Sequence, residues 1–152
     1  PPGRMQKLDK NNIWIDYAHT PDALSNALQT LHFHYPESKL RIVFGCGGDR
    51  DKSKRQQMGK IASELAHSII LTNDNPRNEQ PENIIKDIMV GVKIENNTQV
   101  ILDRKIAINT AITTLNEDEV LLIAGKGHET TQIIGSQVLP FSDIEIALDA
   151  LI

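Results

Sequence analysis

Cysteine, aromatic residues and long apolar runs are all scarce in this chain. Cys46 is the single cysteine among 152 residues, so an intrachain disulfide is excluded, and we expect a small buried thiol in a reducing compartment. Aromatic residues make up only 4%, which leaves little with which to stack nucleic-acid bases. No apolar run approaches the roughly 20 residues that span a bilayer. We therefore expect a cytoplasmic protein without membrane insertion.

Excess positive charge and a phosphate-binding P-loop are also missing. Sixteen Lys and Arg against twenty Asp and Glu give a net charge of -4, which excludes the global positive field that gathers nucleic acid. Neither Gly59-Lys60 nor Gly125-Lys126 has the upstream glycine and the following Ser or Thr that a P-loop needs. If the protein uses ATP, another domain must hold the triphosphate. One cysteine and scattered histidines also argue against a metal site.

The length and the first residues bear on domain organisation. A chain of 152 residues, 39% of them hydrophobic, is long enough for one domain with a real core and too short to expect two. We therefore take residues 1–152 as one domain. The chain opens on Pro1-Pro2-Gly3-Arg4, without a methionine or a signal sequence, and these residues are typical of a linker. We expect one domain of a larger protein.

Apolar runs alternate regularly with helix-patterned segments. This rhythm favours a Rossmann-like, doubly wound α/β fold, with a mostly parallel sheet and helices on both faces. Gly135-Ser136, near the end of the chain, predicts a β-hairpin that contributes an antiparallel strand. Strands are predicted at residues 12–15, 40–44, 68–71, 99–102, 119–124, 132–134 and 137–139, and the helix after residue 103 is predicted to bury Ile106, Ala107, Ala111 and Ile112.

Residues that cap helices stand where the helical patterns begin. Thr20 precedes Pro21, a residue suited to the first helical position. Asp103 precedes the fourth helical pattern, and either Ser142 or Asp143 precedes the last one. A side-chain oxygen at such a position can accept a hydrogen bond from an unpaired backbone N–H of the first turn. We expect these residues to fix the starts of three helices.

Two polar loops, residues 72–77 and 125–129, follow apolar strand-like runs. Strands of an open parallel sheet end at one edge, where their loops converge on a single crevice. Turn chemistry explains the Asp, Asn and Pro of the first loop but not Arg77, whose guanidinium can bind a carboxylate bidentately. In the second loop Glu129 could hold an ammonium group, or it could form an acid–base pair with His128. Spacing alone does not choose between these two roles.

A glycine-rich loop at residues 45–52 follows another predicted strand. It suits close approach of the backbone to a ligand, but Arg50 stands at the third glycine position of the dinucleotide fingerprint and excludes that assignment. Arg50, Lys52, Lys54 and Arg55 form a basic cluster that could be a solvated face. Arg50 lies nearest the end of the strand, so we expect it to reach the crevice.

Six motifs follow one another in an order that resembles the C-terminal domain of the Mur ligases, specifically the MurE type, which adds diaminopimelate. The resemblance covers essentially the whole chain. Each motif is weak by itself, whereas six in register are specific. The motifs are residues 2–5, 16–22, 45–52, 74–77, 125–129 and 141–143.

The resemblance implies a domain of an ATP-dependent amide ligase of bacterial peptidoglycan synthesis, with roles in cell wall biogenesis, cell shape and cell division. Such enzymes activate the D-glutamate carboxylate of UDP-N-acetylmuramoyl-L-alanyl-D-glutamate as an acyl phosphate, which the amine of an incoming amino acid attacks. ATP and Mg²⁺ are held mainly by a central domain, and UDP by an N-terminal one. Both domains are absent from this sequence, in agreement with the missing P-loop. We expect the chain alone to be inactive, with no catalytic residue of its own.

The resemblance also implies roles for individual residues. Arg4, Asp16 and His19 would bind ATP, with Arg4 at the terminal phosphate and Asp16 at the ribose. A second set would form the pocket for the incoming amino acid. These residues are Arg50, Asp74, Asn75, Arg77, Gly125 and Glu129.

The chemistry of that second set fits meso-diaminopimelate, whose far end carries a carboxylate and an ammonium. Arg77 can pair with the carboxylate, while Glu129 and the carbonyl of Gly125 can accept from the ammonium. Lysine lacks the distal carboxylate, and lysine-adding relatives typically do not have arginine at this place. We therefore predict diaminopimelate as the partner, with an L-lysine-adding ligase of the same family as the near alternative.

A phosphoacceptor receiver domain is an alternative from a different class. That fold is also doubly wound, and Asp74 after the third predicted strand and Lys126 after the fifth match its pattern. Against it, Asp16 has no adjacent acidic partner for magnesium, and the terminal hairpin is extra. A stand-alone binding module is a further alternative, which the linker-like start argues against.

Overall fold

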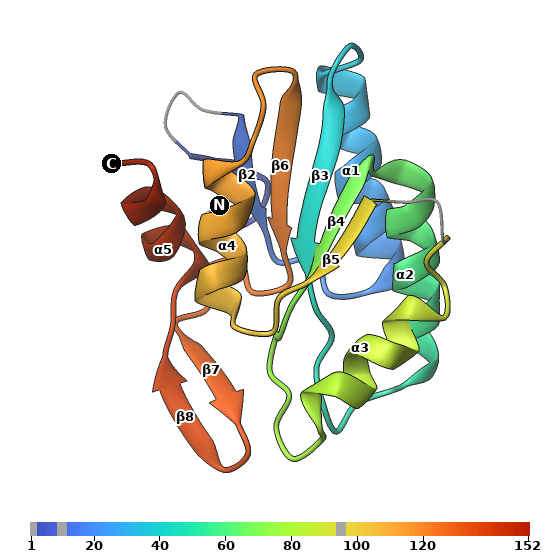
Figure 1. The fold of residues 1–152 in the computed structure, drawn as a ribbon, viewed down its shortest axis with the longest axis vertical. Coiled ribbons are helices and arrows are strands. Elements are labelled where there is room, and N and C mark those ends of the chain that lie inside the picture. Colours follow the sequence, from blue (N-terminus) through green and yellow to red (C-terminus); the bar gives the residue numbers. More distant parts are fainter. Residues whose placement is uncertain (1–2, 9–11, 94–96) are drawn as a thin grey trace.

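A six-stranded sheet forms the centre of the molecule (Figure 1), seen in a computed structural model that describes residues 3–8, 12–93 and 97–152. Pro1 and Pro2 of the linker-like start lie outside the described residues. The strand order is β1-β2-β6-β3-β4-β5, and every pair is parallel except β1 with β2. The strands are β1 (Gln6–Lys7), β2 (Ile13–Asp16), β3 (Lys39–Phe44), β4 (Ser68–Leu71), β5 (Asn97–Val100) and β6 (Glu119–Ala124).

Helices cover both faces of this sheet, which confirms the predicted doubly wound α/β architecture (Figure 1). One hydrophobic cluster lies between the sheet and α1 (Pro21–His34), α2 (Ser53–Leu65) and α3 (Pro81–Met89). A second cluster lies on the other face, under α4 (Arg104–Thr113) and α5 (Asp143–Ala150). Within the described residues, no helix is long and apolar enough to cross a membrane.

Strand β6 shows how the sequence specifies two covered faces. All six of its residues are buried, as expected for a central strand of a parallel sheet. Its side chains alternate, so that Leu122 and Ala124 belong to the first cluster and Leu121 and Ile123 to the second. An uninterrupted apolar run therefore serves two cores at once.

The expected helix starts are confirmed. Thr20 Oγ1 accepts from the N–H of Ala23 at 3.2 Å, and Asp103 Oδ1 accepts from Ile106 at 3.0 Å. At the last helix Ser142 is the cap, because its hydroxyl accepts from the N–H of Glu145 at 3.2 Å. The other candidate for that cap, Asp143, is fully buried.

The inner side of α4 was only partly predicted. Ile106 was expected in the core and is 55% exposed, whereas Ile108 is fully buried beside Ala107, Ala111 and Ile112. Successive helical residues are ~100° apart, which places position 106 opposite the mean direction of the other four. The β5 prediction was displaced by two residues, since the strand spans Asn97–Val100.

The predicted C-terminal hairpin forms from β7 (Thr131–Ile134) and β8 (Gln137–Pro140), with Gly135 in the left-handed region at φ 60°. It is a separate two-stranded sheet, and β1 supplies the antiparallel strand of the main sheet. A single parallel bridge between Arg77 and Ile134 joins the hairpin to the loop after β4.

Candidate functional site

A cavity of ≈ 380 Å³ opens at the carboxyl ends of β2, β3, β4 and β6. After β3 the chain continues to α2, which covers one face of the sheet. After β6 it continues to α5, which covers the other face, so the strand order switches here. Ligands of open α/β sheets bind at such a point. Seven of the nine residues singled out from the sequence line this cavity: His19, Arg50, Asp74, Asn75, Arg77, Gly125 and Glu129.

Arg77 presents a cation without a carboxylate partner. Its Nη1 donates to the carbonyls of Gly48 at 2.9 Å and Asn75 at 3.4 Å, and among the described residues no carboxylate lies within ion-pair distance of it. Its backbone is left-handed at φ 53°, a conformation that costs about 1–3 kcal/mol for a residue other than glycine. A Cβ on Gly47 would lie 2.9 Å from Nη1, so glycine leaves room for the guanidinium. The remaining donors of Arg77 are available to an anion.

Lys126 was not among the predicted site residues; it is not one of the residues that line the cavity, and it has no exposed surface. Its Nζ donates to Asn75 Oδ1 at 2.8 Å and to the carbonyl of Thr131 at 3.0 Å, and it lies 3.2 Å from Asp74 Oδ1. Asn75 Oδ1 also accepts from the N–H of Ile133 at 2.9 Å. Lys126 therefore fixes the loop after β4 against β7. Only its position after a strand and between two glycines could have indicated this role.

Gly125 brings the loop after β6 close to Asp74. Its φ of 116° lies outside the range that other residues adopt readily, and a Cβ there would lie 2.6 Å from Asp74 Oδ2. The amide of Gln132 donates to the carbonyl of Asp74 at 2.9 Å and holds the same segment from the hairpin side. Asp74 is consequently buried and immobilised at the rim of the cavity.

Glu129 is one of three carboxylates that line the cavity, together with Asp51 and Asp74. Burial raises the pKa of its carboxyl, and the neighbouring Asp74 raises it further, while Lys126 lowers it. Its N–H donates to the carbonyl of Lys126 at 2.9 Å, which shapes the turn that carries it. His128 is exposed and contacts the ring of Tyr17, with 6.3 Å between ring centroids. The described structure therefore records no Glu129–His128 pair.

The other two candidates, Arg4 and Asp16, lie beside the cavity. Arg4 Cζ lies 5.6 Å from the centroid of the Tyr17 ring. Both carboxylate oxygens of Asp16 accept backbone hydrogen bonds, from Met5 at 2.8 Å and Ala18 at 3.0 Å. Arg4 and His19 thus both contact the ring of Tyr17, with 4.6 Å between the ring centroids of His19 and Tyr17, and Asp16 precedes Tyr17 in the chain.

Cys46 and Met58 form a soft apolar part of the cavity wall, with their sulfurs 3.7 Å apart. Burial raises the pKa of the Cys46 thiol to about 12, and the charge of Asp74 contributes in the same direction. The thiol is therefore neutral at physiological pH. Within the described ranges, no three His, Cys, Asp or Glu side chains are grouped closely enough to hold a metal ion.

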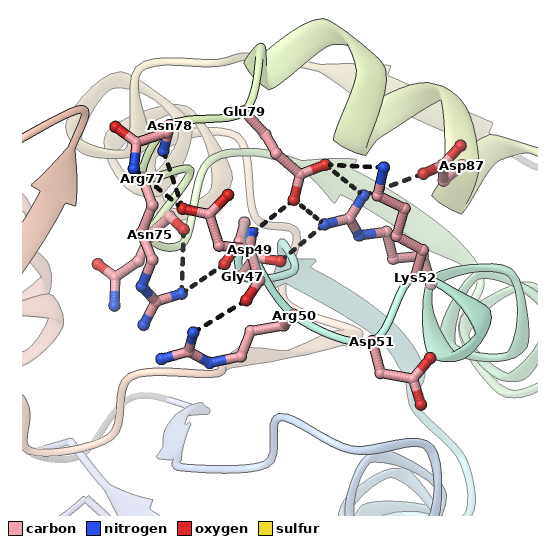
Figure 2. A network of polar contacts seen from close by, with 12 residues as sticks. Gly47, Asp49, Arg50, Asp51, Lys52, Asn75, Arg77, Asn78, Glu79 and Asp87 are labelled. Carbon is pink, nitrogen blue, oxygen red and sulfur yellow. Dashed lines mark hydrogen bonds and ion pairs between the residues drawn. The ribbon is translucent and has the colours of Figure 1, made fainter.

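Arg55 was expected to belong to a cluster that could be a solvated basic face, but it is buried. It is 1% exposed and pairs with Glu79 and Asp87, at 2.6 and 3.0 Å (Figure 2). Arg50 is exposed and donates to the carbonyl of Asp49 at 3.0 Å. The cluster of four basic residues therefore divides into a buried anchor and cations near the cavity.

Comparison with known proteins gives consistent matches over the whole chain. Residues 3–127 match the family described as Mur ligase, glutamate ligase domain. A UDP-N-acetylmuramoyl-L-alanyl-D-glutamate–2,6-diaminopimelate ligase of Coxiella burnetii is 54% identical over 153 residues, covering 99% of this chain and 31% of that protein. The enzyme of the same name from Rickettsia montanensis is 51% identical over 145 residues, covering 95% and 30%. A solved structure of a ligase of this name superposes with a TM-score of 0.92 at 41% identity, covering 99% of this chain and 31% of the other. The chain spans about a third of the length of these relatives.

Proposed function

Because this chain belongs to the Mur ligase family, we propose that it is the amino-acid-binding domain of a ligase that adds meso-diaminopimelate to UDP-N-acetylmuramoyl-L-alanyl-D-glutamate. The reaction is ATP-dependent and takes place in the cytoplasm during peptidoglycan synthesis. The receiver-domain alternative is wrong, since the family of this chain is a different one. The L-lysine-adding alternative predicts a site without a cation for a second carboxylate, and Arg77 is such a cation.

The observation that carries this proposal is the charge arrangement around the cavity. Arg77 and Arg50 line the cavity, and among the described residues neither has a carboxylate partner, while Glu129 lines the same cavity. Each end of diaminopimelate carries one carboxylate and one ammonium. A guanidinium binds the carboxylate through parallel hydrogen bonds, and a carboxylate side chain accepts from the ammonium. The distal end of the amino acid would lie between Arg77 and Glu129, with the carbonyl of Gly125 as a further acceptor.

The contribution of these residues to the reaction is positioning. The neutral amine of diaminopimelate attacks the carbonyl carbon of the acyl phosphate, and an amide bond forms. The bond between that carbon and the phosphate oxygen breaks, phosphate leaves with the bonding electrons, and the nitrogen loses one proton to water. Holding the distal end fixes where the amine stands, and well-oriented reactants can reach effective molarities of ~10⁵ M or more. Asp74 and Asn75, immobilised by Lys126, provide a rigid wall for this purpose.

ATP supplies the phosphoryl group that activates the carboxylate, and it would be held with Mg²⁺ mainly by parts of the ligase other than this chain. Arg4, Asp16 and His19 would contribute from the side of the cavity. Arg4 is an exposed cation suited to a phosphate, and the ring of Tyr17 offers an apolar surface beside it. Asp16 already accepts two backbone hydrogen bonds, so a ribose hydroxyl would share its remaining lone pairs.

Calorimetric titration of the chain with meso-diaminopimelate and with L-lysine tests the proposal. We expect selective binding of diaminopimelate that is lost in Arg77→Ala. Arg4→Ala is the matched control, because it removes an exposed cation outside the cavity. Equal binding of lysine, or full retention of diaminopimelate binding in Arg77→Ala, would contradict the assignment.

A further inference from the structure

The three-residue segment 47–49 is attached to the segment that follows Arg77. The N–H of Asp49 donates to Glu79 Oε2 at 2.6 Å, and Asp49 Oδ2 accepts from the N–H and side-chain amide of Asn78 at 3.3 and 3.2 Å (Figure 2). Asp49 itself has a left-handed backbone at φ 54°. A conformation of this kind persists only where its surroundings impose it. Glu79 and Asn78 are the residues that impose it here.

Arg55 binds Glu79 and also contacts segment 47–49 directly. Its two terminal nitrogens bind the Glu79 carboxylate at 2.6 and 3.2 Å, and Nη2 also donates to the carbonyl of Gly47 at 2.9 Å. The pKa of Glu79 is lowered to about 2, mainly by the hydrogen bond from Arg55, and the N–H of Asp49 contributes in the same direction. The carboxylate is therefore charged throughout the physiological range.

Two of the three arginines that line the cavity, Arg77 and Arg50, are oriented by carbonyls of this segment. Gly48 lies between the two anchored residues, and its carbonyl accepts from Arg77 Nη1 at 2.9 Å. The carbonyl of Asp49 accepts from Arg50 Nη1 at 3.0 Å. Figure 2 shows that the guanidinium of Arg77, which comes from the loop after β4, and the guanidinium of Arg50 lie in the same region of the view. A shift of residues 47–49 would therefore displace both cations together.

Stability alone does not account for the placement of Glu79. Asp87 also pairs with Arg55, at 3.0 Å, but its side chain is 43% exposed, and within the described part of the chain it makes no hydrogen bond or ion pair with residues 47–49. Glu79 instead joins Arg55 to a backbone N–H of the segment that orients the cavity cations. The two carboxylates share a partner and differ in what else they touch.

We propose that Glu79 is a positioning residue for amino-acid specificity, which fixes residues 47–49 and thereby sets where Arg77 and Arg50 meet the distal carboxylate of the amino acid. This inference rests on the proposed function. It predicts that Glu79 affects the binding of diaminopimelate but not the binding of lysine, which lacks that carboxylate. The effect acts through the segment 47–49 and not through contact with the substrate.

The test compares Glu79→Gln with Asp87→Asn. Each variant neutralises one of the two carboxylates that pair with Arg55. Affinity for meso-diaminopimelate and for L-lysine is measured by calorimetry on the chain, and kcat and KM for both amino acids are measured in the complete ligase. We expect Glu79→Gln to weaken diaminopimelate binding and raise its KM by roughly tenfold, since small displacements of binding groups have effects of this size. Asp87→Asn should change either value by less than about twofold.

Thermal unfolding of both variants separates positioning from loss of fold. A tenfold effect of Glu79→Gln on diaminopimelate, with the lysine values and KM for ATP unchanged, supports the inference. Equal effects of the two variants, or losses for both amino acids that follow the loss of stability, overturn it. Should Glu79→Gln not fold, Arg55→Lys keeps the charge and removes the bond to Gly47, and the same selectivity shift is expected. Absence of diaminopimelate binding and turnover in the unaltered protein would refute the proposed function itself.

Discussion

The ammonium of Lys126, which has no exposed surface, lies 3.2 Å from a carboxylate oxygen of Asp74. Removing one partner of a buried pair leaves the other charge uncompensated, which typically costs about 3–5 kcal/mol. We therefore expect Lys126→Ala to lower the free energy of unfolding by about 3 kcal/mol or more. Urea denaturation measures this value.

Lys60→Ala is the control for that experiment, because Lys60 is an exposed residue of α2. Its effect should stay within about 0.5 kcal/mol. Equal effects of the two substitutions would show that the pair contributes nothing to stability.

Gly125 and Gly135 allow a matched comparison of two left-handed glycines. Alanine at position 125 would place its Cβ 2.6 Å from Asp74 Oδ2, whereas at position 135 nothing lies within 4 Å. We expect Gly135→Ala to cost about 1–2 kcal/mol from backbone strain alone, and Gly125→Ala to cost more and to abolish amino-acid binding. Thermal unfolding and calorimetry of both variants distinguish the two effects. Retained binding in Gly125→Ala would refute the close contact.

Protonation of Glu129 should control binding of the amino acid. Burial raises the pKa of this carboxyl above 4.5, so the folded chain holds the proton more tightly than the unfolded chain does. Its contribution to stability is therefore largest below the unfolded pKa and declines as the pH rises through the folded pKa. A bound ammonium favours the charged carboxylate, so binding should release a proton, and affinity should fall as the pH drops through the raised pKa.

Calorimetry in two buffers with different ionisation enthalpies detects that proton release. The expected result is a buffer-dependent binding enthalpy that becomes buffer-independent in Glu129→Gln. An unchanged pH dependence in this variant would assign the linked proton to another group.

The Cys46 thiol should resist alkylation in the folded protein. With a pKa of about 12, about one thiol in ten thousand is ionised at pH 8, and the thiolate is the reactive form. Mass spectrometry after iodoacetamide treatment should show no modification within minutes, and rapid modification in urea. Cys46 is half-buried in the cavity wall, so fast labelling of the folded chain would contradict the raised pKa of this thiol.

Local sequence patterns predicted the helices and strands, because the formation of these elements depends largely on residues that are neighbours in the sequence. The apolar run of β6 and the caps Thr20 and Asp103 are of this kind. Ile106 was wrongly assigned because a hydrophobic residue in the first turn of a helix does not show which way the helix is rotated. That rotation is fixed by packing against the sheet.

The sequence predicted those residues of the candidate site that follow directly after a strand. Arg77 and Glu129 could be placed at one crevice by topology alone. The roles of Lys126, Arg55 and Glu79 could not, because each depends on partners brought together by the fold. Arg55 looked like one of four surface cations, and only its burial against Glu79 reveals an anchor.

The hairpin of β7 and β8 makes the cavity a late product of synthesis. Gln132 and Ile133 hold the loop after β4, which the ribosome has made 58 residues earlier. Strand β6, which closes the sheet between β2 and β3, is also a late segment. A nascent chain that ended before the hairpin would carry Arg77 and Asp74 without the contacts that order them. On the proposed function, recognition of the amino acid would therefore be a property that this domain acquires only with its last strands.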